Sequence, residues 1–189
     1  MPRLVVFNHV TLDGYFTDMQ GDMSWAHDAK PDAEWSAFVN GNASGGGRLI
    51  FGRVTYQMMA SYWPTAQAHE SNPTVAKQMD GLPKVVFSKT LDSAAWNNTR
   101  LVKTDPVSEI RKLKQESGPD MTIMGSGQII AQLAQEKNLI DEYQIIVKPK
   151  VLGDGRTLFE GVKERLTFQL KKSRVFDNGN VLLCYEPLG

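Results

Sequence analysis

The amino-acid sequence predicts an α/β fold with a mostly parallel central sheet that ends in an antiparallel hairpin. In the middle of the chain, a short apolar stretch, 121–124, leads through a glycine turn and an amphipathic stretch to a second apolar stretch, 143–147. This order is typical of a strand–helix–strand unit, in which the two strands are parallel. Near the C-terminus, two apolar-patterned runs, 166–176 and 181–186, flank Asn178-Gly179, which is a strong signal for a β-hairpin.

The size and charge of the chain limit what it can be. Its 189 residues suffice for a substantial core, so we expect residues 1–189 to form a single domain. Lysine plus arginine and aspartate plus glutamate both number 21, so the formal net charge is zero. A protein that binds nucleic acid by neutralising phosphates needs an excess of positive charge. We therefore expect a small-molecule substrate and no nucleic-acid partner.

The numbers and spacing of cysteine, histidine and apolar residues indicate the cellular compartment and whether a metal site is expected. The single Cys184 cannot form an internal disulfide, and its apolar neighbours predict a buried, inert thiol in a reducing compartment. No apolar run approaches the length of a membrane span, and the N-terminus lacks the apolar core of a signal peptide. The three histidines are widely spaced and offer no metal-ligand pattern. We expect a cytoplasmic protein without membrane contact or a metal site.

The first expected strand, 4–10, is apolar and β-branched apart from Asn8 and His9. Thr11-Leu12-Asp13-Gly14 follows it directly. An aspartate at the carboxyl end of a central strand points into the crevice where open α/β sheets bind ligands. An ordinary Asp-Gly turn is the alternative interpretation.

A long polar segment, 17–29, follows and contains Trp25. Loops of this length inside compact domains are usually functional, so Trp25 either stacks on a ligand ring or fastens the loop to the core. Residues 31–40 then predict a helix that begins near Asp32.

A second motif begins after the glycine-rich segment 41–47, which we expect to be a flexible surface connection. The apolar run 49–51 predicts a strand that leads into Gly52, Arg53 and Thr55 at the start of an expected helix. A planar guanidinium pairs with phosphate through two hydrogen bonds, and a threonine at a helix start adds a hydroxyl donor. These residue types favour phosphate binding, with a capped helix and a solvated arginine as the alternative.

Two further strands and a helix follow. Residues 84–88 predict a buried strand that ends in polar residues, Ser88-Lys89, and residues 97–103 predict a short edge strand. Asp105-Pro106 marks the start of a helix that continues to Glu116 with a charged outer face.

The stretch 121–159 organises the chain. Gly125-Ser126-Gly127 follows its first strand, and the apolar positions of the helix expected over 128–138 fall on one face. The first amides of a helix lack intrahelical partners and carry about half a positive charge, so a glycine turn lets a phosphate reach them. The dinucleotide-binding fingerprint does not fit, because Ile130 stands where its third glycine is needed. The Gly-Lys-Ser or Gly-Lys-Thr of a phosphate-binding P-loop does not occur.

Several motifs combine in this stretch: Gly125-Ser126-Gly127-Gln128, Leu133, Leu139-Ile140-Asp141-Glu142, Pro149, Val151-Leu152-Gly153-Asp154-Gly155-Arg156 and Leu158-Phe159. Together they resemble the C-terminal reductase domain of the riboflavin-biosynthesis enzyme RibD, a domain of the dihydrofolate reductase-like superfamily. Segments 11–14 and 49–56 extend the resemblance over nearly the whole chain. It implies a dihydrofolate reductase-like three-layer sandwich.

The resemblance implies an NADPH-dependent reductase that lacks the deaminase half of the bifunctional enzyme. A basic residue beside Ser88 favours NADPH over NADH, because an acidic residue is expected against a free ribose 2′-hydroxyl. The cofactor-binding residues implied by the resemblance are Thr11, Gly52, Arg53, Thr55, Ser88, Lys89, Gly125, Ser126, Gly127, Gln128 and Ile129.

The implied substrate is a pyrimidine or a pterin, as in riboflavin biosynthesis. Asp13 is expected either to supply the proton or to hydrogen-bond an amino-pyrimidine edge. A carboxylate shut away from water has a raised pKa that lets it donate a proton near neutrality. Asp32 and Glu34 are rivals, because in dihydrofolate reductases the proton-handling carboxylate lies near the start of the corresponding helix. The implied substrate-binding residues are Asp13, Trp25, Asp32, Tyr56 and Arg156.

The resemblance also implies a homodimer that pairs through the C-terminal strands. Two functions from other classes stay open at this point. The chain is alternatively a non-catalytic NADP(H)-binding module, or a dimerisation module whose glycines serve only as turn residues.

Overall fold

The computed structural model describes residues 1–27 and 32–188. Its main element is an eight-stranded sheet with the strand order β5 (Thr99–Val102), β4 (Lys84–Phe87), β3 (Arg48–Gly52), β6 (Met121–Met124), β1 (Leu4–Val10), β7 (Glu142–Val147), β10 (Val181–Pro187) and β9 (Phe168–Val175). The strands from β5 to β7 are parallel, and the hairpin of β9 and β10 joins β7 in the antiparallel sense. The predicted fold class is confirmed.

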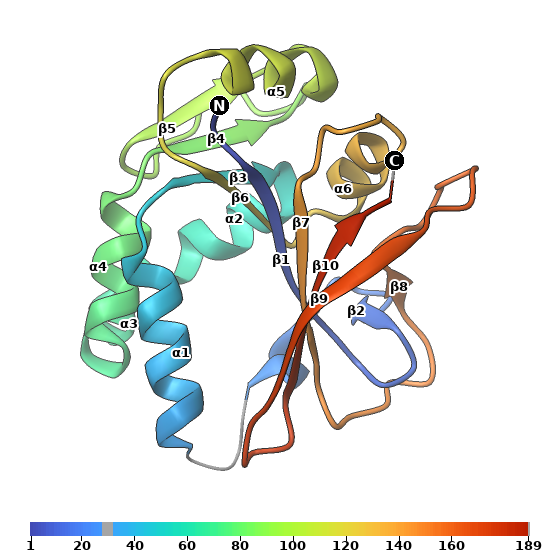
Figure 1. Cartoon of the computed structure of the whole chain (residues 1–189). Coiled ribbons are helices and arrows are strands. Elements are labelled where there is room, and N and C mark those ends of the chain that lie inside the picture. Colours follow the sequence, from blue (N-terminus) through green and yellow to red (C-terminus); the bar gives the residue numbers. More distant parts are fainter. Residues whose placement is uncertain (28–31, 189) are drawn as a thin grey trace.

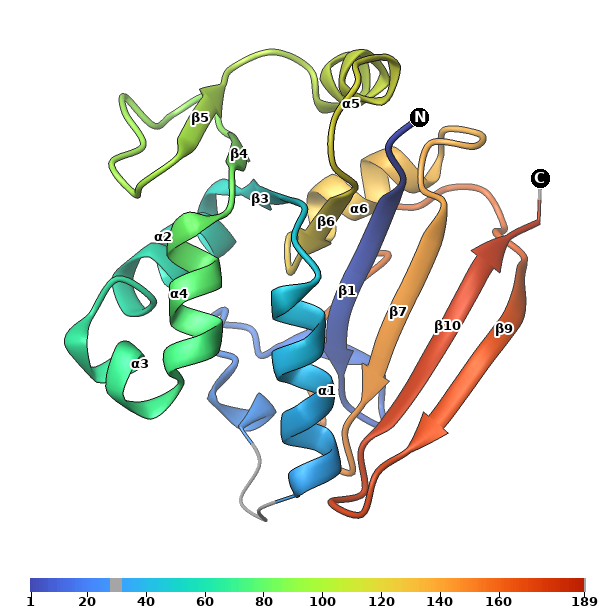
Figure 2. The same cartoon turned by 60° about the vertical axis from the view of Figure 1, so that its left-hand side comes forward.

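Helices cover both faces of this sheet (Figure 1). They are α1 (Ala33–Ser44), α2 (Arg53–Tyr62), α3 (Ala66–Ser71), α4 (Pro73–Gly81), α5 (Pro106–Gln115) and α6 (Gly127–Ala134). Helices α5 and α6 lie on one face, and α1 and α4 lie on the other (Figure 2). The expected three-layer sandwich is therefore present. Among the described residues, no helix combines the length and apolar character needed to cross a membrane.

The central strands are mostly apolar because both faces of the sheet are covered. In β3, Ile50 packs into the cluster beneath α5 and α6, while Leu49 and Phe51 pack with α2 and α4 on the opposite face. In β10, Leu182 and Cys184 pack beneath α1. Burial raises the pKa of the Cys184 thiol, so the predicted buried thiol is confirmed.

Two predicted helix boundaries are wrong, and packing explains both. Helix α1 continues through Ser44, because Val39 and Ala43 pack against the sheet cluster, so half of the expected flexible connection is helical. Helix α6 ends at Ala134, four residues early, and the chain then turns so that Leu139 and Ile140 enter the core. The predicted start of α1 at Pro31 lies outside the described residues.

A second, two-stranded sheet was not predicted. Its antiparallel strands, β2 (Tyr15–Thr17) and β8 (Arg156–Thr157), join segments that are far apart in the sequence. The segment expected to be a long loop therefore begins as a strand, and it continues with a short 3-10 helix, η1 (Ser24–Ala26). The pairing brings the loop after β1 against the loop after β7.

A buried lysine stands at the amino end of β4. Lys84 is 1% exposed, and its ammonium group donates to the carbonyl oxygens of Asp80, Leu82 and Asn97 at 3.1, 2.9 and 3.0 Å. The same group lies 4.4 Å from the centroid of the Trp96 ring. Burial lowers the pKa of Lys84 from 10.5 to about 8, and the charge of Asp80 opposes that effect. Lys84 thus ties the end of α4 to the segment before β5.

Replacing Lys84 with Met leaves these three carbonyl groups without their donor. We expect the free energy of unfolding to fall by roughly 1–3 kcal/mol. The unfolded chain binds more protons than the folded one between about pH 8 and 10.5, so the advantage of the wild type grows as pH rises through that window. Urea unfolding at pH 7 and pH 10 measures both effects. Lys77→Met, on the exposed side of α4, is the matched control and should change stability by less than about 0.5 kcal/mol. Equal losses for the two variants would contradict this role.

Candidate functional site

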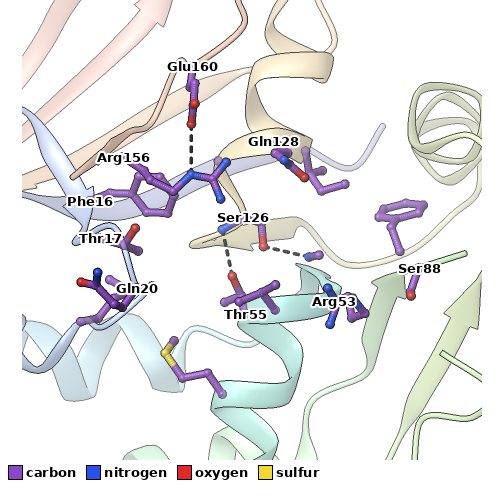
Figure 3. A pocket seen from close by; sticks show the side chains of 18 of the residues that line it. Phe16, Thr17, Gln20, Arg53, Thr55, Ser88, Ser126, Gln128, Arg156 and Glu160 are labelled. Atoms are coloured by element: carbon purple, nitrogen blue, oxygen red, sulfur yellow. Dashed lines mark hydrogen bonds and ion pairs between the residues drawn. The ribbon is translucent and has the colours of Figure 1, made fainter. Parts of the chain in front are cut away.

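A cavity of about 400 Å³ lies where the turns after β3, β4 and β6 meet the β2–β8 sheet. Parallel strands bring their carboxyl ends to the same edge of a sheet, and open α/β sheets bind ligands there. Figure 3 shows side chains of the three turns converging on this pocket, with Arg53 and Ser88 on one side and Thr17 and Gln20 on the other. The pocket therefore has a wall of turns and a wall formed by β2 and β8.

Two helices begin at the pocket with open amides. Residues 52–55 at the start of α2 and 126–129 at the start of α6 line it. Within the described chain, neither helix has a side-chain N-cap or an acidic residue in its first turn. Of the helices that begin elsewhere, α1, α3 and α5 are capped by Asp32, Thr65 and Asp105, whereas α4 begins with a proline and has no side-chain cap. The uncapped starts of α2 and α6 leave N–H donors and positive dipole ends for an external anion.

Hydroxyl groups lock the two helix starts together. The Ser126 amide donates to Thr55 Oγ1 at 3.0 Å, and the Gly52 amide donates to Ser126 Oγ at 2.8 Å. The Ser126 hydroxyl in turn donates to the Met124 carbonyl at 3.0 Å. Thr55 was expected to offer its hydroxyl to the cofactor; in the structure the hydroxyls of Thr55 and Ser126 hold the two turns in register. The main-chain amides that follow them are the donors that face the pocket.

The turn between β6 and α6 demands glycine for reasons of space as well as conformation. Gly125 has φ +58°, and a Cβ there would lie 2.7 Å from Thr55 Oγ1 and Cγ2. A Cβ on Gly127 would lie 2.9 Å from the ring of Phe16. Ser126, between them, has φ +62°, so two successive residues are left-handed. This backbone brings the first amides of α6 to the pocket surface.

The charges around the pocket are mainly positive. Arg53, Lys89 and Arg156 line it, and Glu160 is the one carboxylate among the described lining residues. Arg53 donates to Gln57 at 3.0 Å, and Arg156 donates to Glu160 at 3.1 Å. Arg53 and Lys89 stand beside the open amides of α2, whereas Arg156 belongs to the β2–β8 side. The turn side therefore suits a strongly anionic group.

The structure brings most of the predicted cofactor-binding residues to this pocket. Those that line it are Gly52, Arg53, Thr55, Ser88, Lys89, Ser126, Gly127, Gln128 and Ile129. Gly125 lies directly before them in the turn, and Arg156, predicted for the substrate, also lines the pocket. Ser88 accepts hydrogen bonds from the amides of Thr90 and Leu91, so it shapes the turn after β4.

Thr11 and Asp13 lie outside the described lining. The Asp13 carboxylate accepts from the Thr11 hydroxyl at 2.5 Å and from the amides of Gly153 and Leu152 at 2.7 and 3.3 Å. The Thr11 hydrogen bond lowers the pKa of Asp13, desolvation opposes it, and the two amides lower it further. The expected raised pKa is therefore wrong. Asp13 is exposed and ionised, and it ties the turn after β1 to the loop after β7.

Asp32 and Tyr56 are committed to the scaffold. The two carboxylate oxygens of Asp32 accept from the amides of Trp35 at 2.8 Å and Asn178 at 3.0 Å, which joins the start of α1 to the hairpin turn. Tyr56 is buried on the far side of α2, where its hydroxyl accepts from the Trp96 amide at 2.9 Å. Neither lies in the described lining, so their predicted substrate-binding roles have no support here.

Trp25 also lies away from the described lining. The Lys150 ammonium group donates to the carbonyl oxygens of Trp25 and, at 2.9 Å, of His27. These contacts favour the second of the two interpretations, in which this segment is fastened to the rest of the fold.

Sequence reasoning missed the lining residues on the β2–β8 side. They include Phe16, Thr17, Met19, Gln20, Met23 and Glu160. The strands concerned have three and two residues, too few for a periodic signal. The available clue was the pair of closely spaced glycines just before β8, because glycine permits a close approach of two backbones. A Cβ on Gly155 would lie 2.3 Å from the Thr17 carbonyl oxygen.

The fold and the pocket define a class: a mostly parallel α/β protein with a pocket at the carboxyl ends of its strands. Within that class, the chain belongs to the RibD C-terminal domain family, whose model matches residues 2–182. The resemblance stated from the sequence is confirmed.

Relatives of similar length are known. The Bacillus subtilis (strain 168) protein YyaP is 27% identical over 184 residues, which cover 97% of this chain and 94% of YyaP. YwjB from the same organism is 24% identical over 176 residues and covers 92% of each chain. Both span nearly the same domain as this chain.

Solved structures share the fold. A putative riboflavin biosynthesis protein from Shewanella sp. PV-4 has a TM-score of 0.76, 26% identity and 99% coverage of each chain. The Thermotoga maritima diaminohydroxyphosphoribosylaminopyrimidine deaminase/5-amino-6-(5-phosphoribosylamino)uracil reductase has a TM-score of 0.69 and 15% identity. That match covers 99% of this chain and 57% of the longer enzyme.

Substituting Gly125 with Ala tests the packing of the β6–α6 turn. Gly161 also has a positive φ, but a Cβ there meets nothing within 4 Å, so Gly161→Ala measures the conformational cost alone, about 1 kcal/mol. We expect Gly125→Ala to lose a further 1–3 kcal/mol or so, because its Cβ collides with Thr55. Chemical unfolding of both variants gives the comparison. Equal losses of stability in the two variants would show that the β6–α6 turn does not pack tightly against Thr55 at the start of α2.

Proposed function

We propose that this protein is an NADPH-dependent reductase that acts on a pyrimidine- or pterin-like substrate. The observation that carries the proposal is the convergence of two uncapped helix starts with Arg53 and Lys89 on one pocket. A dinucleotide offers phosphates that need such donors. Membership of the RibD C-terminal family supports a reductase, and the Shewanella relative is described as a putative riboflavin biosynthesis protein.

The pocket residues fit the parts of NADPH in a definite order. The amides of Gly127, Gln128 and Ile129 would hold the pyrophosphate, since the open turn presents them to the pocket. Arg53 and Lys89 would hold the 2′-phosphate at the neighbouring strand ends. Bound NADPH supplies the hydride for the reduction. The protein's own task is to orient the ring and to keep water from it, which falls to the β2–β8 side.

One observation favours a second candidate, a non-catalytic NADP(H)-binding module. Asp13 is ionised and bound by amides, and Asp32 caps α1, so the two expected acids both have structural partners. A reductase needs a proton source at the substrate, either from a side chain or from water. NADPH oxidation measured against a panel of flavin precursors, folates and pterins separates the candidates, because a binding module shows affinity without turnover.

We further propose that a second copy of the chain covers the outer face of the C-terminal hairpin. Val147, Val181 and Val175 stand in one register row across β7, β10 and β9. Val175 is 70% exposed, and Leu170 on the same strand is 49% exposed. Exposed apolar patches mark interaction surfaces. The expectation that the chain pairs through its C-terminal strands agrees with this position and supports a homodimer.

The cofactor assignment predicts how two cations affect the choice of dinucleotide. Arg53→Gln and Lys89→Gln should each weaken NADPH binding about tenfold, or about 1.4 kcal/mol, and leave NADH binding unchanged, because only NADPH carries the 2′-phosphate. Isothermal titration calorimetry with both dinucleotides gives the ratio. The control is Arg111→Gln, which removes an exposed cation of α5 that pairs with Glu136. This variant should bind both dinucleotides like the wild type. An unchanged ratio of NADPH affinity to NADH affinity in a variant that carries both Arg53→Gln and Lys89→Gln would refute the 2′-phosphate assignment.

The dimer proposal predicts that charge on the two exposed apolar side chains of β9 separates the subunits. Val175→Lys together with Leu170→Lys should convert the dimer to a monomer in light scattering, because a charge buried without a partner is costly. Lys172→Gln, on the opposite face of β9 beside Cys184, should leave the assembly unchanged. A wild-type monomer at micromolar concentration, or a dimer in the double variant, would overturn this interface.

A further inference from the structure

Thr17, the last residue of β2, has a buried hydroxyl without a hydrogen-bond partner among the described residues. Its side chain is 7% exposed, and it lines the pocket. Buried polar side chains nearly always have a partner, and leaving one without costs about 1–3 kcal/mol. A valine would fill the same space without that cost. The hydroxyl therefore calls for a partner that the protein itself does not provide.

The backbone around Thr17 leaves the side chain as the part that can move. Thr17 pairs with Arg156 across the β2–β8 sheet. Gly155 approaches so closely that a Cβ there would lie 2.3 Å from the Thr17 carbonyl oxygen. The main chain is thus confined, whereas rotation about the Cα–Cβ bond exchanges the hydroxyl and methyl positions between staggered wells. Such a rotation turns the hydroxyl toward the pocket without displacing β2.

Thr17 lies at the end of the pocket opposite the anion-binding groups. Figure 3 shows Thr17 on the wall that carries Phe16 and Gln20, across from Arg53 and Ser88. The groups suited to phosphate lie on the turn side. A dinucleotide with its phosphates on those turns has its remaining, uncharged half directed toward β2.

The chemistry of this end suits a neutral planar ring that carries an amide. Phe16 supplies an apolar ring edge beside Gly127, and the Thr17 hydroxyl both donates and accepts. A carboxamide also offers a donor and an acceptor, and it carries no charge that needs a counter-ion. We infer that Thr17 is a specificity-determining residue whose hydroxyl binds the carboxamide of the nicotinamide ring. This inference rests on the proposed function.

The test combines stability and affinity in one set of variants. Thr17→Val keeps the shape and removes the hydroxyl, so without ligand its melting temperature should equal or exceed that of the wild type. Its affinity for NADPH should fall about tenfold in calorimetry. Adenosine 2′,5′-bisphosphate lacks the nicotinamide half and should bind the variant and the wild type equally. Thr17→Ser restores the hydroxyl and should recover most of the NADPH affinity.

Two results would overturn the inference. Wild-type NADPH affinity in Thr17→Val would show that the hydroxyl makes no contact with the nicotinamide half. A clear loss of stability in the ligand-free valine variant would show that the hydroxyl already has a partner within the protein. Failure of the proposed function has a different signature, because the wild type would then bind neither NADPH nor the bisphosphate.

Discussion

The pocket depends on one set of hydrogen bonds, those of the Ser126 and Thr55 hydroxyls. They join the start of α6 to the start of α2, across two strands that are neighbours in the sheet and distant in the sequence. An anion site made of main-chain amides works only if those amides stay free of internal partners. The side chains therefore hold the turns together at positions just before the open amides. Gly125 makes this possible, because a side chain there would occupy the space of Thr55.

This arrangement explains a division among the helices. Asp32 and Asp105 cap helices that begin away from the pocket, and each also contacts a second element, the hairpin turn in one case and Gln132 of α6 in the other. Helices α2 and α6 lack such caps within the described structure, and their starts are stabilised through neighbouring turns instead. The open donors of these two helix starts face the same pocket, where a ligand can complete them.

The sequence was sufficient wherever the signal is local. Strand β1, helix α5 and the hairpin at Asn178-Gly179 were predicted because apolar periodicity, an Asp-Pro start and a turn dipeptide each act within a few residues. The hydrogen bonds of Asp13 and Asp32 to main-chain amides could not be predicted, because an aspartate before free amides looks the same in sequence whether it serves a cap or a reaction. The wall at Thr17 was missed because its pairing with Arg156 joins residues at opposite ends of the chain.

The two walls of the pocket differ in how substitution affects them. The turn wall presents main-chain amides, which every residue except proline provides, beside the side chains of Arg53 and Lys89. The β2–β8 wall presents side chains, among them Thr17, Gln20 and Arg156, and each change there alters the chemistry offered to a ligand. Under the proposed function, selectivity for the ring and the substrate resides mainly in the β2–β8 wall. A turn wall made of main-chain amides, together with a β2–β8 wall made of side chains, lets one fold serve different small molecules.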